Sequence, residues 1–177
     1  MTTPYEIRAQ PLTAVEFAPF GHLIAPRPDS PDYRGASGTL GWHVPFESGR
    51  ALLSLLRTPF AGLRFSKMER HLRVTQAFVP LGGSPAVVAV APPADELRIE
   101  DIRAFLLDGS AGYVMHRGTW HSLDRFPLAP PHSDFLMITD HETQDDLTES
   151  YAGRGRWALT QEIDLVALGG QTIAIAI

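Results

Sequence analysis

The sequence predicts an all-β fold with minor helical content, in a single domain over residues 1–177, and three observations lead to this prediction. Short apolar runs recur at spacings of roughly 8–12 residues, a pattern typical of β-sandwiches and β-barrels. The chain contains 15 glycines and 15 prolines, and many of them stand between these runs as turn signals. Hydrophobic residues make up 44% of the chain, which is enough for the core of one globular domain.

The first predicted element is a short helix. Thr13 and Glu16 form a capping box, in which the Thr13 side chain bonds a free backbone N–H and Glu16 reaches back. Pro19 and Gly21 end this helix. Residues 26–41 are rich in Pro, Gly, Ser and Asp, and this composition predicts a surface loop.

Alternation of side chains and the positions of turns predict the strands. Leu63, Phe65 and Lys67 alternate with the residues between them, as in a strand that continues to residue 71. Residues 86–91 are apolar at every position, which predicts a buried strand returning after a turn. Residues 95–101 are expected to hold a helical turn and residues 127–133 a long loop. The predicted strands, in order, are residues 22–24, 63–71, 76–80, 86–91, 104–107, 113–116, 120–124 and 135–139.

The last residues form a separate apolar run, Thr172 to Ile177. A run of this kind would promote aggregation if it were exposed, so we expect it to be paired in a sheet or covered at a subunit contact.

Composition excludes several classes of function. The net charge is -5, with no basic patch, so we expect no nucleic-acid partner and no anionic membrane partner. The chain has no cysteine, which excludes disulfides, thiolate metal sites and cysteine nucleophiles. Residues 1–10 lack the pattern of a signal peptide, and no apolar run is long enough to span a bilayer, so a cytoplasmic location is expected.

Two segments far apart in the chain carry the candidate site. Residues two apart on a strand point to the same face, so Glu69 and His71 project together. Gln76 begins the next strand, and His121 belongs to a different hairpin. Carboxylate, imidazole and amide groups together could hold a divalent ion such as nickel, manganese, iron or zinc. The alternative is a solvated strand edge with a local ion pair, and histidines that bond backbone carbonyls.

Arginines near these segments are candidates for binding a carboxylate, because a guanidinium offers a matching fork of donors. Arg57 ends an apolar run and is expected to point inward, while Arg117 adjoins the second segment. Trp120, beside His121, could wall a pocket or serve as a core residue. The alternative for the arginines is that they are surface residues that aid solubility.

Several longer motifs, which combine into a specific pattern, closely resemble those of the ureidoglycolate lyase family. The similarity covers most of the chain, to about Thr139, and the tail past Thr148 matches poorly. The segments that carry it are Leu12–Ile24, Ser54–Arg57, Glu69–His71, Thr75–Pro80, Arg103–Leu106 and His116–His121.

The resemblance implies a cupin-type barrel, a double-stranded β-helix or jelly roll, usually found as a homodimer. It implies a carbon–nitrogen (amidine) lyase that splits ureidoglycolate to glyoxylate and urea in allantoin degradation. The cupin ligand positions would fall on Glu69, His71, Gln76 and His121, and nickel has been linked to the family. This chain departs from the family motifs in four places: Ser37–Leu40 where an Asn-Gly-Thr-Ala-type run is common, Leu72–Val74 where Pro-Leu-Gly is common, Met115 where Tyr is common, and Ser122–Leu123 where His-Pro is common.

Cleavage of ureidoglycolate requires a base, an acid and an anchor for the carboxylate. The predicted catalytic residues are Glu69, His116 and His121, with His116 as the candidate for proton transfer. The predicted substrate-binding residues are Arg57, Arg117 and Trp120. Two alternatives remain: a cupin enzyme that acts on another small hydroxy or keto acid, and a non-catalytic cupin that binds a small acid as a sensor or carrier.

Overall fold

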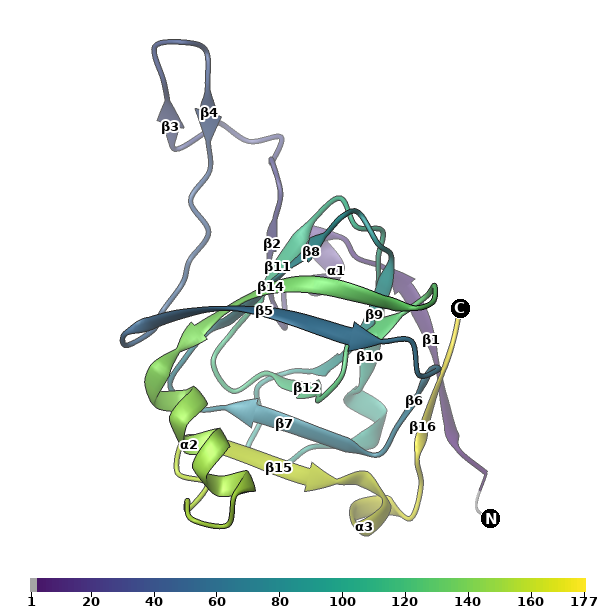
Figure 1. The fold of residues 1–177 in the computed structure, drawn as a ribbon. Coiled ribbons are helices and arrows are strands. Elements are labelled where there is room, and N and C mark those ends of the chain that lie inside the picture. Colours follow the sequence, from purple (N-terminus) through teal and green to yellow (C-terminus); the bar gives the residue numbers. More distant parts are fainter. Residues whose placement is uncertain (1–2) are drawn as a thin grey trace.

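Two curved sheets face each other in the structure, a computed structural model that describes residues 3–177 (Figure 1). This arrangement confirms the predicted all-β class and the expected barrel-like pair of sheets. The larger sheet has the order β15 (Thr160–Asp164), β7 (Lys67–His71), β12 (Trp120–Ser122), β9 (Ala86–Ala91), β10 (Arg103–Leu107), β1 (Tyr5–Pro11), β16 (Ile173–Ala176) and β6 (Arg64–Phe65), with β13 (Phe126–Pro127) also paired to β9. The smaller sheet has the order β2 (Gly21–Ile24), β11 (Gly112–Met115), β8 (Gln76–Leu81), β14 (His132–Asp140) and β5 (Ala51–Pro59).

The N-terminal capping motif forms as predicted. Helix α1 spans Ala14–Phe17, and the Thr13 hydroxyl accepts a hydrogen bond from the Glu16 backbone N–H at 3.2 Å. A helical turn, η1 (Ile99–Asp101), also lies within the segment predicted for it. The helical content is therefore minor, as expected, apart from the longer helix described below.

The predicted strands are found, but several of their boundaries are different. The segment 63–71 is two strands rather than one, because β6 pairs with β16 whereas β7 pairs with β12 and β15. The strand that begins at Trp120 ends at Ser122. The predicted loop 127–133 is shorter, since Pro127 belongs to β13 and His132 begins β14.

Five further regular elements were not predicted. These are β1, β5, β15, helix α2 (His141–Tyr151) and helix α3 (Leu165–Gly169). Only Thr143 and Ser150 of α2 are buried, so this helix lacks the apolar stripe that identifies most helices in a sequence. The apolar C-terminal run forms β16, which pairs in parallel with β1 and antiparallel with β6, and its expected sheet pairing is confirmed.

Two apolar clusters divide the core. The first, called here the interior cluster, fills the space between the sheets and includes Phe78, Val88 and Phe135. The second covers the outer face of the larger sheet and includes Met68, Val87 and Trp120. Successive residues of β9 point alternately into the two clusters, and all six are buried, which confirms the prediction of a strand apolar on both faces.

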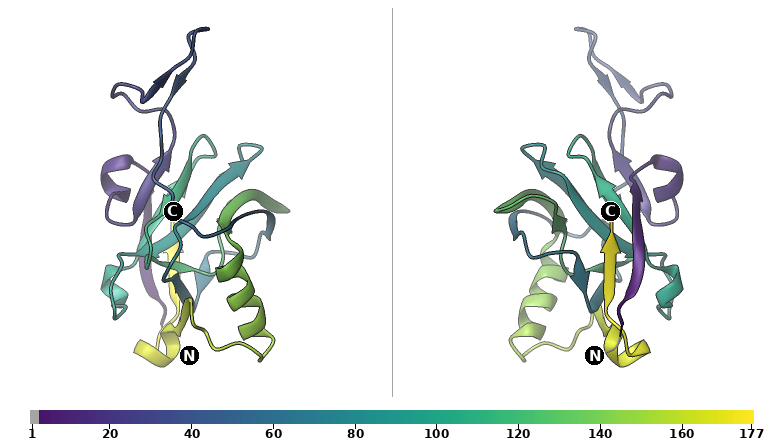
Figure 2. Two further views of the ribbon diagram at one scale, coloured as in Figure 1. Left: turned by 90° about the vertical axis from the view of Figure 1, so that its left-hand side faces the viewer. Right: turned by 90° about the vertical axis from the view of Figure 1, so that its right-hand side faces the viewer.

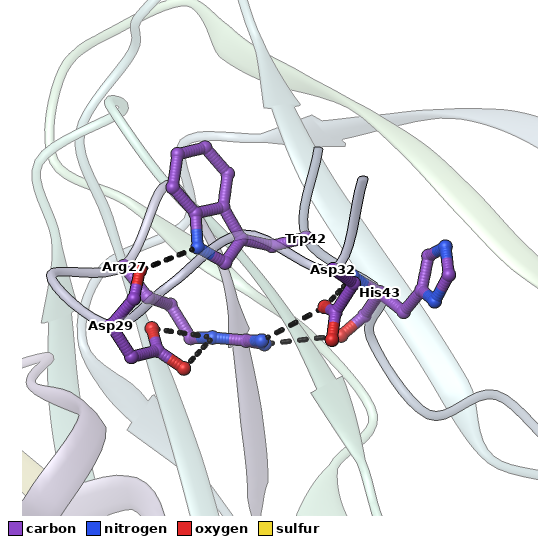
Figure 3. A network of polar contacts seen from close by, with 5 residues as sticks. All are labelled: Arg27, Asp29, Asp32, Trp42 and His43. Carbon is purple, nitrogen blue, oxygen red and sulfur yellow. Dashed lines mark hydrogen bonds and ion pairs between the residues drawn. The ribbon is translucent and has the colours of Figure 1, made fainter. Parts of the chain in front are cut away.

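Residues 25–50 include an arm that stands away from the sheets in both views of Figure 2, whereas Glu47 and Arg50 near the end of this segment hydrogen-bond to the body of the protein. The predicted surface loop within it is instead a small hairpin, because β3 (Tyr33–Arg34) pairs with β4 (Leu40–Gly41). Arg27 holds the base of the arm together (Figure 3): its guanidinium donates to both Asp29 carboxylate oxygens, to the Asp32 carboxylate and to the His43 carbonyl. The Trp42 indole donates to the Asp29 carbonyl at 3.2 Å. The arm connects β2 and β5, the two edges of the smaller sheet.

Within residues 3–177, no helix combines the length and the apolar character needed to cross a bilayer.

Phe17 is the single buried side chain of α1, and its ring packs on Phe20, Phe105 and Tyr113 at centroid separations of 5.2–5.8 Å. We expect Phe17→Ala to lower the free energy of unfolding by about 3–5 kcal/mol, because it leaves a cavity in the interior cluster. Urea unfolding followed by circular dichroism measures this change. Val15→Ala in the same helix is the control, because Val15 is 81% exposed and its truncation removes little buried surface. Equal losses in the two variants would contradict the role assigned to Phe17.

Candidate metal centre

Pairing between β7 and β12 brings three side chains together in the interior. The two strands are antiparallel, and their register sets His121 opposite Glu69. His71 lies two residues after Glu69 on the same strand and so shares its face, as the sequence predicts. Atoms able to bind a metal, one from each of the three residues, lie within 4.8 Å of one another. All three side chains are buried.

Hydrogen bonds fix the orientation of both imidazoles. His121 Nδ1 lies 3.1 Å from the Ser122 carbonyl oxygen, which can only accept, so Nδ1 carries the proton. His71 Nδ1 lies 2.9 Å from the Thr160 hydroxyl on the neighbouring strand β15. The Nε2 atoms of both rings are buried and have no hydrogen-bond partner among the described residues. The Nε2 of His121 therefore carries a lone pair that is free to bind a cation, and that of His71 does so when Nδ1 donates to the Thr160 hydroxyl.

Burial sets the charge of this group. It raises the pKa of Glu69 to about 7 and lowers that of His71 to about 4. Burial also lowers the pKa of His121 well below its usual value. The Glu69 carboxylate lies 3.9 Å from His71 Nε2 and 4.0 Å from His121 Nδ1, but these contacts are not salt bridges, because both imidazoles are neutral at pH 7.

Glu69, His71 and His121 fit a divalent cation. Neutral imidazole and carboxylate are common ligands of first-row transition metals, and buried nitrogens without partners are costly unless something binds them. Metal–nitrogen bonds of about 2.1 Å allow donor separations of up to roughly 4 Å, so a small inward adjustment of the side chains completes the site. The structure thus contains a buried Glu-His-His group that could bind a metal.

Gln76, the fourth predicted ligand, begins β8 on the facing sheet. Its side chain is buried, and its Nε2 lies 3.6 Å from the sulfur of Met137, a member of the interior cluster. Its Oε1 is buried and has no hydrogen-bond partner in the described chain. Gln76 therefore places in the interior an oxygen atom that could bind a metal. Its role as the fourth ligand stays a prediction.

His116, the predicted proton-transfer residue, lies at a different place. Its Nε2 is 3.3 Å from the Ala18 carbonyl, and its ring packs edge-on against His22 at 4.8 Å. Both contacts are with the segment that runs from α1 into β2, and the ring is half-buried. His116 is not part of the Glu-His-His group, and this position does not support its predicted role.

The predicted substrate-binding residues also lie outside the interior. Arg57 is on the outer face of β5, where its guanidinium makes a bidentate pair with Asp134, so the expectation that it points inward is wrong. Arg117 is about half exposed and pairs with Glu47 at 2.7 Å. Trp120 is a buried residue of the outer cluster, because it adjoins His121 on the strand and so faces the opposite way.

A surface cavity of about 870 Å³ is bounded by Trp120 on that outer side of the larger sheet. Ile163 and Leu168 also line it. Thr160, which contacts His71, belongs to its lining, whereas Glu69, His71 and His121 do not.

Sequence reasoning missed three residues of the interior. Thr160 orients His71, the Tyr113 hydroxyl is buried without a partner, and Arg125 places its guanidinium 3.6 Å from the centroid of the Phe78 ring. Arg125 follows the end of β12, so the alternation of strand side chains does not predict its direction. Thr160 comes from β15, a strand that was not predicted.

Comparison with known proteins gives consistent results. The family model described as ureidoglycolate lyase matches residues 4–159. A ureidoglycolate lyase from Burkholderia mallei is 34% identical over 170 residues, which are 90% of this chain and 96% of that protein. One from Pseudomonas savastanoi is 34% identical over 80% of this chain and 87% of its own length. A third, from Azotobacter vinelandii, is 38% identical over 63% of this chain and 72% of its own length.

Solved structures give weaker similarities. RmlC from Streptococcus suis overlaps with a TM-score of 0.36 at 9% identity, covering 52% of this chain and 45% of that one. The sugar 3,4-ketoisomerase QdtA from Thermoanaerobacterium thermosaccharolyticum overlaps with a TM-score of 0.35 at 17% identity, covering 70% of this chain and 83% of that one. Overlaps this low carry no functional information. The family model and the relatives, by contrast, span most of the sequence, and the chain belongs to the ureidoglycolate lyase family.

Proposed function

We propose that this protein is a ureidoglycolate lyase, which splits ureidoglycolate into glyoxylate and urea in allantoin degradation. The observation that carries the proposal is the buried Glu69, His71 and His121 group in the barrel of a chain that belongs to this family. Neutral imidazoles with free Nε2 atoms, beside a carboxylate, form a reactive centre inside an otherwise apolar interior.

The reaction needs two proton movements. The hydroxyl of ureidoglycolate loses a proton as the carbon–nitrogen bond breaks, and the nitrogen that leaves with urea gains one. Glu69 and His121 are the proposed groups for these transfers, because a carboxyl with a pKa of about 7 can either accept or give a proton at neutral pH. His116 is not proposed for this step, because of its position beside Ala18 and His22.

A divalent ion is proposed at the same place, held by Glu69, His71 and His121 with Gln76 as the fourth ligand. When bound, such an ion supplies Lewis-acid polarisation of an oxygen. A donor set of imidazole, carboxylate and amide without thiolate suits nickel, manganese, iron or zinc. Glu69 cannot bind the metal and carry a proton at the same time. Turnover that is lost when a chelator removes the metal would favour the role of ligand, and turnover that persists would favour the role of proton carrier.

A homodimer is proposed from the outer face of the smaller sheet. Edge strand β5 exposes Leu53 and Leu55 by 64% and 77%, and Ile138 and Leu136 lie directly across from them on β14. Exposed leucines on an edge strand favour association, and a second copy can present the same patch to it around a two-fold axis.

The remaining expectations stay predictions. We propose that residues 1–177 act as one domain, because β1 and β16, from opposite ends of the described chain, pair with each other in one sheet. A small ureido or hydroxy acid is the proposed partner. The cytoplasmic location and the lack of nucleic-acid or membrane partners remain predictions from the sequence.

The first test concerns metal and activity together. We expect His71→Ala and His121→Ala to lose both the bound divalent ion and glyoxylate release, because each removes an imidazole from the group. Elemental analysis and a coupled assay for glyoxylate and urea measure the two losses. His132→Ala is the control, since His132 is partly exposed and lies beside Asp134. Turnover that stays intact in both interior variants would contradict the proposal, and turnover of another hydroxy or keto acid alone would favour the alternative enzyme.

The second test concerns the hydrogen bond that orients His71. We expect Thr160→Val to weaken metal affinity by about 10- to 100-fold, the usual effect of removing a group that orients a ligand. Competition with a metal-binding dye measures the change. Thr119→Val is the matched control, because it also removes a buried hydroxyl, but one that donates to the Phe20 carbonyl. Equal affinities of wild type and Thr160→Val would show that the contact with His71 does not support a metal site.

The third test concerns the dimer. We expect Leu55→Asp to convert the protein to a monomer, because a carboxylate in the buried centre of the apolar patch would lose its hydration. Analytical ultracentrifugation of both proteins measures the mass. A wild-type protein that sediments as a monomer, or a Leu55→Asp variant that stays dimeric, would contradict this interface.

A further inference from the structure

Arg125 is a buried cation that lacks an anionic partner. Its side chain follows β12 and turns into the interior, where the guanidinium lies over the ring of Phe78. The residue is 6% exposed. No carboxylate among residues 3–177 lies within 4.0 Å of it, whereas most arginines with an ion pair in this chain, such as Arg57, are well exposed. A buried charge without a partner is costly, so it suggests a ligand.

One edge of the Arg125 guanidinium holds no carboxylate. The hydrogen bond from Nη1 runs to the Leu123 carbonyl at 3.0 Å, Nε is buried without a partner, and the Tyr113 hydroxyl lies close to the group. The edge formed by Nε and Nη2 is the one that Arg57 uses to hold both oxygens of Asp134, each at 2.9 Å. Arg125 therefore keeps available the fork that binds a carboxylate elsewhere in this molecule.

Arg125 lies within electrostatic range of the Glu-His-His group. Its positive charge opposes the effect of burial on the pKa of Glu69 and adds to the lowering of the pKa values of His71 and His121. It also acts on the pKa of Tyr113, which burial raises. Because the guanidinium lies over Phe78, a residue of the interior cluster, it shares the barrel interior with the three candidate ligands.

A small cavity connects Arg125 with the surface. Its volume is about 160 Å³, and it is lined by exposed residues such as Ala61 and Arg64 on one side and by the buried Arg125 on the other. Typical ligand pockets measure roughly 300–1,000 Å³, so this cavity suits a molecule of only a few heavy atoms. Arg64, Arg125 and Asp124 line it, so its walls carry one net positive charge, which favours an anion.

We propose that Arg125 is the substrate-binding residue that receives the carboxylate of a small 2-hydroxy or 2-oxo acid, in place of Arg57 and Arg117. This inference rests on the proposed function, in that the acid is the substrate or product of the same interior site. The carboxylate lies against the Nε–Nη2 edge, and the reacting carbon then faces Glu69 and His121. The apolar ring of Phe78 keeps the guanidinium in place by packing against its flat side.

The test measures binding of glyoxylate and of its neutral amide, glyoxylamide, by calorimetry, and turnover of ureidoglycolate. We expect Arg125→Met to weaken glyoxylate binding and to raise KM by about 10- to 100-fold, and to leave glyoxylamide binding unchanged. Arg125→Lys keeps the charge but not the fork, so its loss is expected to be smaller. Arg154→Met is the control, because Arg154 is an exposed residue paired with Glu149.

A thermal unfolding measurement without ligand separates binding from a structural role. If the role of Arg125 is to bind a ligand, the Tm of Arg125→Met without ligand is expected to equal or exceed that of the wild type, because the substitution removes an unpaired buried charge. A clear fall in Tm together with unchanged glyoxylate affinity in Arg125→Lys would overturn the proposal, as would equal glyoxylate affinity of wild type and Arg125→Met. If glyoxylate binding depends on Arg125 but ureidoglycolate is not turned over, the proposed function fails and the anion site stands.

Discussion

The register between β7 and β12 is the constraint on which the site depends. It sets Glu69 opposite His121, and the two-residue period of a strand then places His71 on the same face. A slip of one residue would turn all the side chains of one strand to the other face of the sheet. Met68 and Trp120 oppose such a slip, because they pack in the outer cluster while their polar neighbours point inward. The core that stabilises the barrel therefore also assembles the reactive group.

Burial explains the chemistry of this group better than any single contact. Two imidazoles, a carboxyl and a guanidinium share an interior lined by Phe78, Tyr113 and Met137, where water does not compensate charge. The low dielectric keeps the imidazoles neutral and brings the Glu69 carboxyl close to half-ionised at pH 7. Polar groups that lack partners in such surroundings destabilise the protein, so an ion that binds there would raise its stability.

The sequence predicts the fold class and the central trio well, because both depend on local patterns. Glu69 and His71 are two residues apart, and the family motifs indicate which distant histidine joins them. Arg57 was misjudged because β5 is apolar on both of its faces, so its run of leucines does not reveal which side is inside. The opposite directions of Trp120 and His121 follow from strand geometry and could have been predicted. Arg125 and Thr160 could not, because they depend on an irregular turn after β12 and on a strand pairing across most of the chain.

The parallel pairing of β1 with β16 has a consequence for synthesis of the protein. Tyr5 pairs with Ile173, so the partner of the first strand leaves the ribosome only after almost all the other elements have been translated. During translation β1 can pair with β10, but its other edge stays open until β16 has been made. The larger sheet is thus completed late in synthesis, and the open edge of the nascent chain is where chaperones would act to prevent misassociation.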